Sequence, residues 1–398
     1  MSVKTTLYNW SPTRSSTGST TTEANFSTAT IPSVDVSARA LLPYPAPKPA
    51  DESVVKRIEA LWQTDHKFVV LSGPPGTGKT RAAEDAIAHN HFLSGSHATL
   101  DNCRLSHLFP DFRTRTITEE EISLTLLEHG ANFVWEIAVM HPQYTYEDLI
   151  RGYRLESSST GTAMGLKVRE GSLGFIARVS EIIQRSEVDS QRVTATLLLD
   201  EFNRAPIGQL FGEALYALDR RGVSVATPYT LESYGQRFSV PQSTQILGTM
   251  NSVDRSTNYL DLALRRRFTT LALVSNRSAV ENAWSAWNKG REICLSLYDN
   301  LQQLVSNASR EGDIQITELV LGQSYFLAPK TVRSEVEAVE WLAMSYVFKM
   351  LPTLRDYEVQ GLLNFSSGDL ARLPGNVGVD YQRLASTSAS SFEAFRLA

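Results

Sequence analysis

The most informative segment of the chain is LSGPPGTGKT, residues 71–80. From Gly73 to Thr80 it matches the pattern G-x-x-x-x-G-K-[ST], and it lies between an apolar run and a helical pattern. A strand before such a loop and a helix after it are the context in which this pattern binds phosphate groups. The sequence therefore predicts a phosphate-binding loop in an α/β fold.

Each part of this loop has a task in holding a polyphosphate. Its three glycines permit backbone angles that aim successive N–H groups into one hollow. The helix that begins near Lys79 adds its positive N-terminal end. Lys79 is expected to reach the β- and γ-phosphates, and the Thr80 hydroxyl to ligate Mg²⁺. The expected phosphate-binding residues are Gly73, Pro74, Pro75, Gly76, Thr77, Gly78, Lys79 and Thr80.

The apolar runs around the loop predict buried parallel strands. Each run is continuous rather than alternating, as in a sheet covered by helices on both faces. Helical patterns lie between the runs, which favours a doubly wound α/β domain. The expected strands are 68–72, 196–200, 245–250 and 269–274, with 132–140 as a fifth candidate. The expected intervening helices are 80–88, 175–185 and 207–220.

Composition divides the rest of the chain. The N-terminal part is rich in Ser, Thr and Pro with few large apolar residues, which predicts a disordered or partner-docking segment. Strand patterns end near residue 275, and the helical patterns 279–296, 298–306 and 332–350 predict a smaller α-helical domain after it. The expected domains are the N-terminal segment 1–50, an α/β nucleotide-binding domain 51–275, a helical lid domain 276–370 and a flexible tail 371–398.

The overall composition narrows the class of protein. The formal net charge of −5 gives no general attraction to DNA or to an anionic membrane, so DNA contact is expected only through a local patch or a partner. Cys103 and Cys294 form no disulfide or metal-binding pattern. No apolar run approaches the ~18 residues of a membrane span, and the N-terminus has no signal-peptide core. A cytoplasmic location is expected.

Two carboxylates end the apolar run 196–200. In open α/β sheets ligands bind at the carboxyl ends of the strands, which places Asp200 and Glu201 at the expected site. Asp200 is expected to hold Mg²⁺, directly or through water, and Glu201 to orient the attacking water. Asn203 and Arg204 follow, as candidates either for contact with a neighbouring subunit or for capping of the next helix.

A polar residue also ends the run 245–250. Asn251 is expected at the same sheet edge, where its amide could hydrogen-bond the γ-phosphate or the attacking water. Asp254 and Arg255 follow within one turn.

Three consecutive arginines, Arg265 to Arg267, precede the last expected strand. One interpretation is that they stabilise a helix C-terminus. A second is an arginine finger that enters a neighbouring subunit's nucleotide site, for which we favour Arg265 or Arg266. Successive helical residues lie ~100° apart, so the three cannot all reach one phosphate. A third interpretation, nucleic-acid binding, fits the order of the motifs less well.

These motifs resemble the McrB-type AAA+ GTPases of modification-dependent (type IV) restriction systems. The resemblance covers about residues 55–365. It rests on DEFNRAPIGQLFGEALYALD (200–219), GTMNSVDRS (248–256), LDLALRRRF (260–268), HPQYTYEDLIRGYR (141–154) and LGQSYF (321–326). By position, Asn251 matches the signature asparagine of that family, and Asp254 and Arg255 its downstream pair. Asn203 and Arg204 match the end of its Asp-Glu-x-Asn-Arg motif.

The resemblance implies more than the residues show. It implies a three-layer AAA+ sandwich with a helical lid, a hexameric ring with nucleotide at subunit interfaces, Mg²⁺ as cofactor and GTP preferred to ATP. It also implies an McrC-like endonuclease partner that stimulates hydrolysis and cuts DNA, in restriction or antiviral defence. The chain departs from the family where a modified-base-recognition domain is usual, so recognition of DNA is expected from another subunit. No Asn-Lys-x-Asp motif occurs, which leaves GTP against ATP open.

Two other functions fit the same motifs. One is a nucleotide-gated assembly platform, in which binding rather than turnover builds a complex; Glu201 weighs against it. The other is a MoxR-like AAA+ chaperone ATPase, against which the segments 248–256 and 141–154 weigh.

Overall fold

The computed structural model describes most of the chain after residue 51. The chain divides into two units at residue 46, and the described residues belong to the second, Pro47–Ala398. The expectations for residues 1–50 and 371–398 lie outside the described residues, and the fold below belongs to the second unit. The described ranges are 52–96, 98–157, 164–185, 194–232, 234–253, 262–308, 315–329 and 331–365.

A five-stranded parallel sheet has the order β2-β5-β8-β1-β9. All five predicted strands are present in it, with ends within two residues of those expected. The central strands are buried along almost their whole length, which explains why their sequences are continuously apolar. The α/β prediction is therefore confirmed. The strands are β1 (Phe68–Gly73), β2 (Phe133–Val139), β5 (Thr194–Asp200), β8 (Thr244–Asn251) and β9 (Thr269–Ala272).

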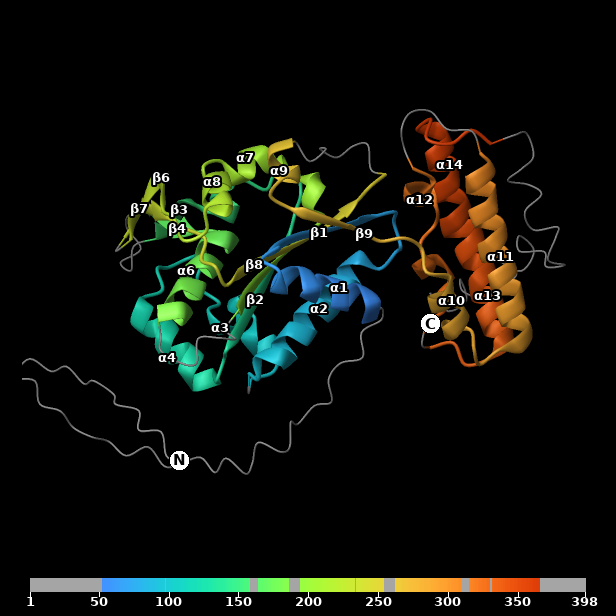
Figure 1. The fold of residues 1–398 in the computed structure, drawn as a ribbon, viewed down its shortest axis with the longest axis horizontal. Coiled ribbons are helices and arrows are strands. Elements are labelled where there is room, and N and C mark those ends of the chain that lie inside the picture. The colour runs from blue at the N-terminus through green and yellow to red at the C-terminus, as the bar shows by residue number, and fades with distance from the viewer. Residues whose placement is uncertain are drawn as a thin grey trace, which may run out of the picture. The chain divides into compact units, whose positions relative to one another are not determined.

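Helices cover both faces of the sheet. The connection from β1 to β2 crosses the sheet in one direction, and the connections β2–β5, β5–β8 and β8–β9 run in the other. Because crossovers between parallel strands are right-handed, the first connection and the later ones place their helices on opposite faces. Figure 1 shows α1 and α2 on one side of the sheet, and α7 and α8 on the other. These helices are α1 (Glu52–Gln63), α2 (Lys79–Ser94), α7 (Ile207–Phe211) and α8 (Ala214–Asp219).

Two expected helices are interrupted. The expected helix 207–220 is divided into α7 and α8 at Gly212, whose φ of 45° and ψ of −127° are not helical. The expected helix 279–296 is divided into two helices, α10 (Arg277–Ala283) and α11 (Asn288–Asn307). Between them the fully buried Trp284 donates its indole N–H to the carbonyl of Phe326 at 2.7 Å. The helix is interrupted where this ring is buried. The helical pattern of the sequence does not reveal that burial.

Two β-hairpins were not predicted from the sequence. They lie beside each other, and the rings of Tyr153 and Tyr229, one from each hairpin, meet edge to face at 5.3 Å. The hairpins are β3 (Arg151–Ser157) with β4 (Met164–Glu170), and β6 (Val225–Leu231) with β7 (Gly235–Phe238). The remaining helices of this part are α3 (Leu105–Leu108), α4 (Glu119–His129), α5 (Tyr146–Leu149), α6 (Ser172–Arg185) and α9 (Leu262–Arg265).

The C-terminal helices pack around a second hydrophobic core. The α/β core ends at Leu273, whereas the second core takes its residues from Val280 onward, with one exception. That exception is Val253, which follows β8 yet packs with the C-terminal helices. The two cores agree with an α/β part and a lid. The bounds of the four predicted domains stay predictions. The lid also contains α12 (Ile316–Leu319), α13 (Glu335–Ser345), the π-helical turn Tyr346–Met350 and α14 (Leu351–Val359).

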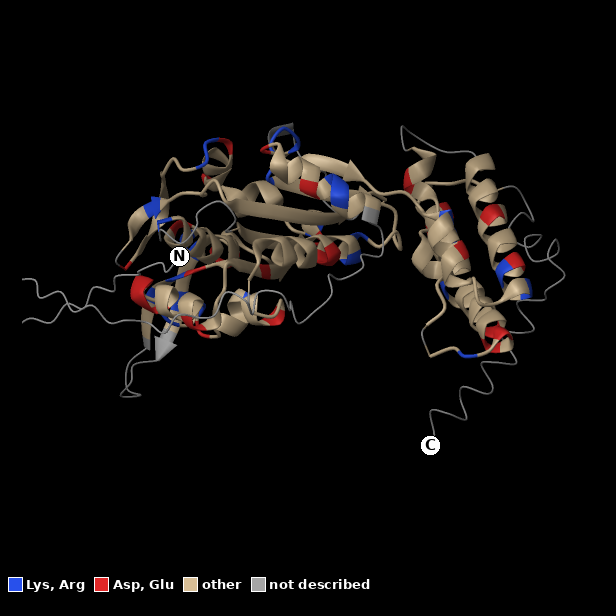
Figure 2. Ribbon diagram, turned by 60° about the horizontal axis from the view of Figure 1, so that its bottom comes forward, with Lys and Arg blue, Asp and Glu red and all other residues tan. Residues whose placement is uncertain are grey.

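The distribution of charged residues and the hydropathy of the helices bear on possible contacts with DNA and membranes. Figure 2 shows acidic and basic residues interspersed along the helices of both parts. Within the described ranges, no helix has the length and apolar character that crossing a membrane requires.

Candidate functional site

The site predicted from the sequence lies at the carboxyl edge of the sheet. β1 and β8 are neighbours, and Gly73, where the phosphate loop begins, is in register with Asn251. β5 lies on the other side of β8 and ends at Asp200. The loop, the acidic pair and Asn251 therefore come together, at the edge where parallel sheets bind their ligands.

The phosphate loop is arranged around Lys79. Its Nζ donates to the carbonyl oxygens of Gly73 at 3.0 Å and Pro74 at 2.9 Å. Burial lowers the pKa of Lys79 to about 8, although the carboxylates of Glu201 and Asp200 oppose the shift. Gly78 caps α2 with a φ of 81°, which glycine adopts at little cost. The loop thus holds a cation and a helix N-terminus together, a combination that suits phosphate.

Asp200 is held by two hydroxyl groups. The Thr80 Oγ1 donates to its Oδ1 at 2.9 Å, and the Thr249 Oγ1 donates to the same oxygen at 2.5 Å. Mg²⁺ in nucleotide sites takes few protein ligands and completes its octahedron with phosphate and water oxygens. The adjacent Thr80 hydroxyl and Asp200 carboxylate fit such a site.

Glu201 has an unusual backbone conformation. Its φ of 55° and ψ of 43° are left-handed, which costs a non-glycine residue ~1–3 kcal/mol. The Nδ2 of Asn251 donates to Oε1 and Oε2 of its carboxylate at 3.3 and 3.2 Å, and the Nε of Arg204 lies 3.3 Å from Oε2. Its N–H donates to the Thr249 Oγ1 at 3.2 Å. The carboxylate is therefore fixed beside the phosphate loop, where an attacking water can be oriented.

The remaining signature residues divide into three groups. Asn203 is buried, and its Nδ2 donates to the carbonyl of Asn251 at 3.1 Å, which fastens the end of β8. Arg204 pairs with Glu201 and is 49% exposed. The capping alternative is not supported, because Pro206 is the N-cap of the next helix and no side chain caps it. Asp254 and Arg255 lie outside the described residues.

The arginine cluster lies at the opposite edge of the sheet. It begins with Arg265, the last residue of α9, and precedes β9, whose amino end lies beside the amino end of β1. The side chain of Arg267 is 8% exposed, pairs with Asp219 and donates to the carbonyl of Leu215 at 3.1 Å. Arg265 and Arg266 are exposed. Arg267 thus has a structural role within the subunit. The two candidates for an arginine finger, Arg265 and Arg266, are accessible to solvent.

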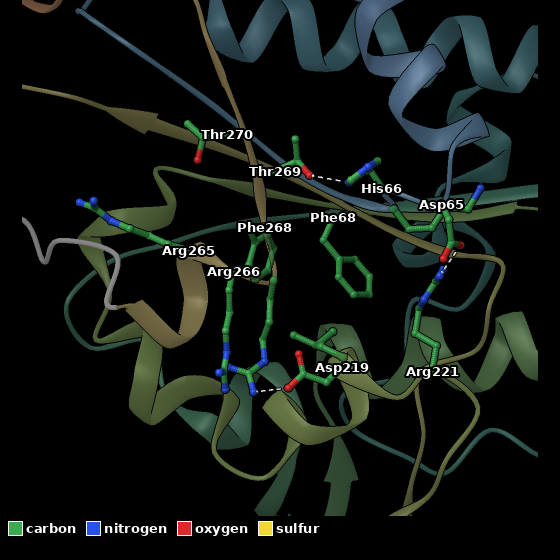
Figure 3. Close-up of a pocket in the computed structure, with 13 residues that line it drawn as sticks. Asp65, His66, Phe68, Asp219, Arg221, Arg265, Arg266, Phe268, Thr269 and Thr270 are labelled. Atoms are coloured by element: carbon green, nitrogen blue, oxygen red, sulfur yellow. Dashed lines mark hydrogen bonds and ion pairs between the residues drawn. The ribbon is translucent and has the colours of Figure 1, made fainter.

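A pocket of about 590 Å³ adjoins this cluster (Figure 3). The His66 Nδ1 and Thr269 Oγ1, 3.0 Å apart, lie on its wall, and Arg221 forms an ion pair with Asp65 there. The hydrogen bond from Arg221 lowers the pKa of Asp65. Because the pocket is at the amino ends of β1 and β9, it is distinct from the phosphate loop. Its basic lining residues are His66, Lys67, Arg221, Arg265, Arg266 and Arg267.

Sequence reasoning missed two contributors to the phosphate edge. Thr249, buried and bonded to both acidic residues, precedes the predicted Asn251 by two positions and carries no motif signal of its own. The lid residue Gln323 lies far along the chain, yet its Nε2 donates to the carbonyl of Thr77 at 2.7 Å.

Comparison with known proteins agrees with this geometry. The family model described as "AAA domain (dynein-related subfamily)" matches residues 120–268, which include the acidic pair, Asn251 and the arginine cluster. The type IV methyl-directed restriction enzyme EcoKMcrB subunit of Escherichia coli (strain K12) is 26% identical over 317 residues. Residues 120–268 are thus similar to AAA domains, and the chain is similar to McrB over most of its length. The McrB-type resemblance and the P-loop AAA+ fold predicted from the sequence are thereby confirmed.

The extent of these similarities is limited. The match to the McrB subunit covers 78% of this chain and 57% of that protein, so the chain spans little more than half of the relative's length. Among solved structures, C. elegans PCH-2 has a TM-score of 0.31 at 15% identity, covering 85% of this chain and 69% of that one. A putative ATPase from Cytophaga hutchinsonii has a TM-score of 0.29 at 13% identity, covering 84% and 91%. Both scores are low.

Proposed function

We propose that this McrB-like AAA+ chain is a magnesium-dependent nucleoside triphosphatase. The observation that carries the proposal is the hydrogen bond between Thr80 and Asp200, at 2.9 Å, which joins the phosphate loop to the acidic end of β5. With Glu201 fixed next to this pair, the groups that phosphoryl transfer to water requires are assembled at one sheet edge. The AAA family match and the similarity to McrB support the same activity.

Each residue of the edge has a role in this proposal. The N–H groups of the loop and the Lys79 ammonium bind the phosphates, while Thr80 and Asp200 hold Mg²⁺, which would supply charge stabilisation at the β- and γ-phosphates. Glu201 orients and polarises the attacking water. Asn251 fixes the Glu201 carboxylate and lies close enough to the same region to contact the γ-phosphate or the water. Little covalent chemistry is needed from the protein, because positioning and charge account for most of the catalysis.

The active assembly in this proposal is a ring of identical subunits, hexameric by similarity to the family. Arg265 and Arg266 are exposed at the edge of the sheet opposite to the phosphate loop. They are therefore poorly placed to reach their own subunit's nucleotide and well placed to reach a neighbour's. One of them serves as the finger that stabilises charge on the transferred phosphoryl group.

The ring drives or gates an McrC-like DNA endonuclease in restriction or antiviral defence. This part of the proposal rests on the similarity to the McrB restriction subunit. GTP is proposed as the preferred substrate from the resemblance of the sequence motifs to McrB-type GTPases. Contact with DNA is made through the complex, since the chain has a net charge of −5 and interspersed surface charges.

The experiment is steady-state release of phosphate from GTP and ATP, with and without the nuclease subunit. In Glu201→Gln the amide cannot polarise water, so turnover should fall at least ~10²-fold, the usual contribution of a positioned general base. Nucleotide binding should persist. Glu358→Gln, an exposed carboxylate on the lid helix α14, is the matched control and should turn over like the parent protein. Equal rates in Glu201→Gln and the parent would sink the proposal.

A further inference from the structure

A short lid segment lies against the phosphate loop. We call Gly322–Ser324 the strap. The N–H of Gly322 donates to the carbonyl of Pro75 at 3.2 Å, and the N–H of Ser324 donates to the carbonyl of Gly76 at 2.9 Å. Between them, the Gln323 side chain donates to the carbonyl of Thr77 at 2.7 Å. Three successive residues of the lid thus bind three successive carbonyls of the loop.

These three bonds fix the direction of the loop's N–H groups. In a trans peptide the C=O and the following N–H lie in one plane and point in opposite directions. When the strap binds the carbonyls of Pro75, Gly76 and Thr77, it turns the next three N–H groups away from the lid segment. Those N–H groups, of Gly76, Thr77 and Gly78, are the donors that a phosphate-binding loop needs. The bonds therefore hold the loop with these three donors directed away from the strap.

Close packing makes the contact specific. A Cβ added to Gly322 would lie 2.0 Å from the carbonyl carbon of Gly76, and one added to Gly76 would lie 2.6 Å from the Ser324 Oγ. Such separations are too short for non-bonded atoms, so the two backbones can approach this closely only with glycine at position 322. At Gly76 the added atom would meet the side chains of Ser324 and Tyr325.

Gln323 connects this contact to the start of the lid. While its Nε2 donates to Thr77, its Oε1 accepts a hydrogen bond from the N–H of Asn276 at 3.2 Å. Asn276 is the N-cap of α10, and its own side chain accepts from the N–H of Ala279. One amide group therefore joins the phosphate loop to the N-terminus of the first lid helix, 47 residues earlier in the chain.

We propose that Gln323 is a positioning residue that holds the phosphate loop in its nucleotide-binding conformation. The inference rests on the proposed function for its ligand, a nucleoside triphosphate. Gln323 itself contacts the outer carbonyl of Thr77 and not the phosphates. Without this bond the peptide that joins Thr77 to Gly78 is no longer held in one orientation, and the Gly78 N–H becomes a less well-oriented donor.

The test compares Gln323→Met with the parent chain. Methionine has a similar length and fills the site, but it neither donates to Thr77 nor accepts strongly from Asn276. Gln303→Met, an exposed position on α11, is the matched control. In equilibrium titrations with fluorescent GTP and ATP analogues, Gln323→Met should bind about tenfold more weakly, as expected for the loss of one or two hydrogen bonds that order the site.

Kinetics and hydrogen exchange separate positioning from a structural defect. KM should rise about tenfold while kcat at saturation stays within about twofold, and the thermal midpoint should equal that of Gln303→Met. In the nucleotide-free protein, the amide hydrogens of Gly322 and Ser324 should exchange faster in Gln323→Met than in the control. A lowered thermal midpoint with unchanged KM, or unchanged affinity together with unchanged exchange, would overturn the inference.

The two proposals fail differently. If the parent chain binds no nucleotide, or Lys79→Ala binds it as well as the parent, the proposed function falls. If the parent binds nucleotide, Lys79→Ala does not, and Gln323→Met binds like the parent, only the role of Gln323 falls.

Discussion

The two ends of the central sheet differ in how exposed their charged side chains are. At the carboxyl edge, Lys79 donates a hydrogen bond to Gly73, and the carboxylates of Asp200 and Glu201 accept hydrogen bonds from Thr80 and Asn251. At the amino edge, the side chain of Arg267 is 8% exposed, whereas Arg265 and Arg266 are exposed. In the proposed head-to-tail ring, the exposed basic edge of one subunit would meet the acidic and phosphate-binding edge of the next.

The largest expected effect tests this division between edges. Arg266→Ala should lower turnover ~10³–10⁵-fold if Arg266 is the finger, while nucleotide binding is retained. Arg265→Ala is the matched comparison, and the larger loss identifies the finger. Phosphate release and binding of a fluorescent nucleotide are measured on the same preparations. If neither variant loses more than about threefold, the amino edge has no catalytic role.

Mixing subunits sharpens the same prediction. Glu201→Gln keeps the arginine edge, and Arg266→Ala keeps the acidic edge. In mixed rings of the two inactive variants, some interfaces join the intact acidic edge of an Arg266→Ala subunit to the intact arginine edge of a Glu201→Gln subunit. Nucleotide turnover should recover at these interfaces. No recovery on mixing, in rings shown to contain both variants, would contradict a site shared between subunits.

The next effect concerns the carboxyl edge and its lysine. Burial lowers the pKa of Lys79 to about 8, and a triphosphate favours the charged ammonium. Binding therefore takes up a proton once the free lysine begins to lose it, so affinity is greatest below that pKa and falls as the pH rises through it. The loss should reach about tenfold one unit above the pKa, as the protonated fraction falls. Titrations of ATP and GTP across this range measure it; a flat profile would contradict a titrating lysine in the site.

The smallest effect concerns Thr249. Thr249→Val keeps the shape but removes the hydroxyl that donates to Asp200 and accepts from the N–H of Glu201. Turnover should fall about fivefold, and the Mg²⁺ concentration for half-maximal rate should rise, since each lost bond is worth about 1 kcal/mol. Thr331→Val, at an exposed lid position, is the control. If both variants have the same Mg²⁺ dependence, Thr249 is only a packing residue.

The sequence predicts the carboxyl edge better than the amino edge for a physical reason. The phosphate loop and the acidic pair each consist of consecutive residues. The sequence patterns of the adjoining strands and helices therefore identify them directly. Arg267 differs from Arg265 and Arg266 because it contacts Asp219 and Leu215, about fifty residues away, and no local pattern separates the three. The parallel strands were predictable because burial on both faces gives continuous apolar runs.

Other parts of the fold could not be predicted because tertiary contacts override local signals. The hairpins carry exposed apolar residues such as Leu155 and Leu166, whose alternation is weak. The helix 207–220 looks continuous until the close approach of the Tyr146 ring to Gly212 is known. Gln323 contacts the loop across 246 residues, and the strap segment was recognisable only as a family-like motif. The roles given to the site residues stay predictions.

The packing of Val253 has a mechanical consequence for hydrolysis. Val253 is anchored among the lid helices, while Asn251, two residues earlier, is the last residue of a strand in the main sheet. A segment of two residues spans at most ~7 Å. The α/β core and the lid core can therefore move apart very little at this point. Any sizeable shear of the lid must pull on the strand end that carries the amide beside Glu201. Under the proposed function, a movement of the lid would therefore reach the water-orienting carboxylate of Glu201 through the covalent chain.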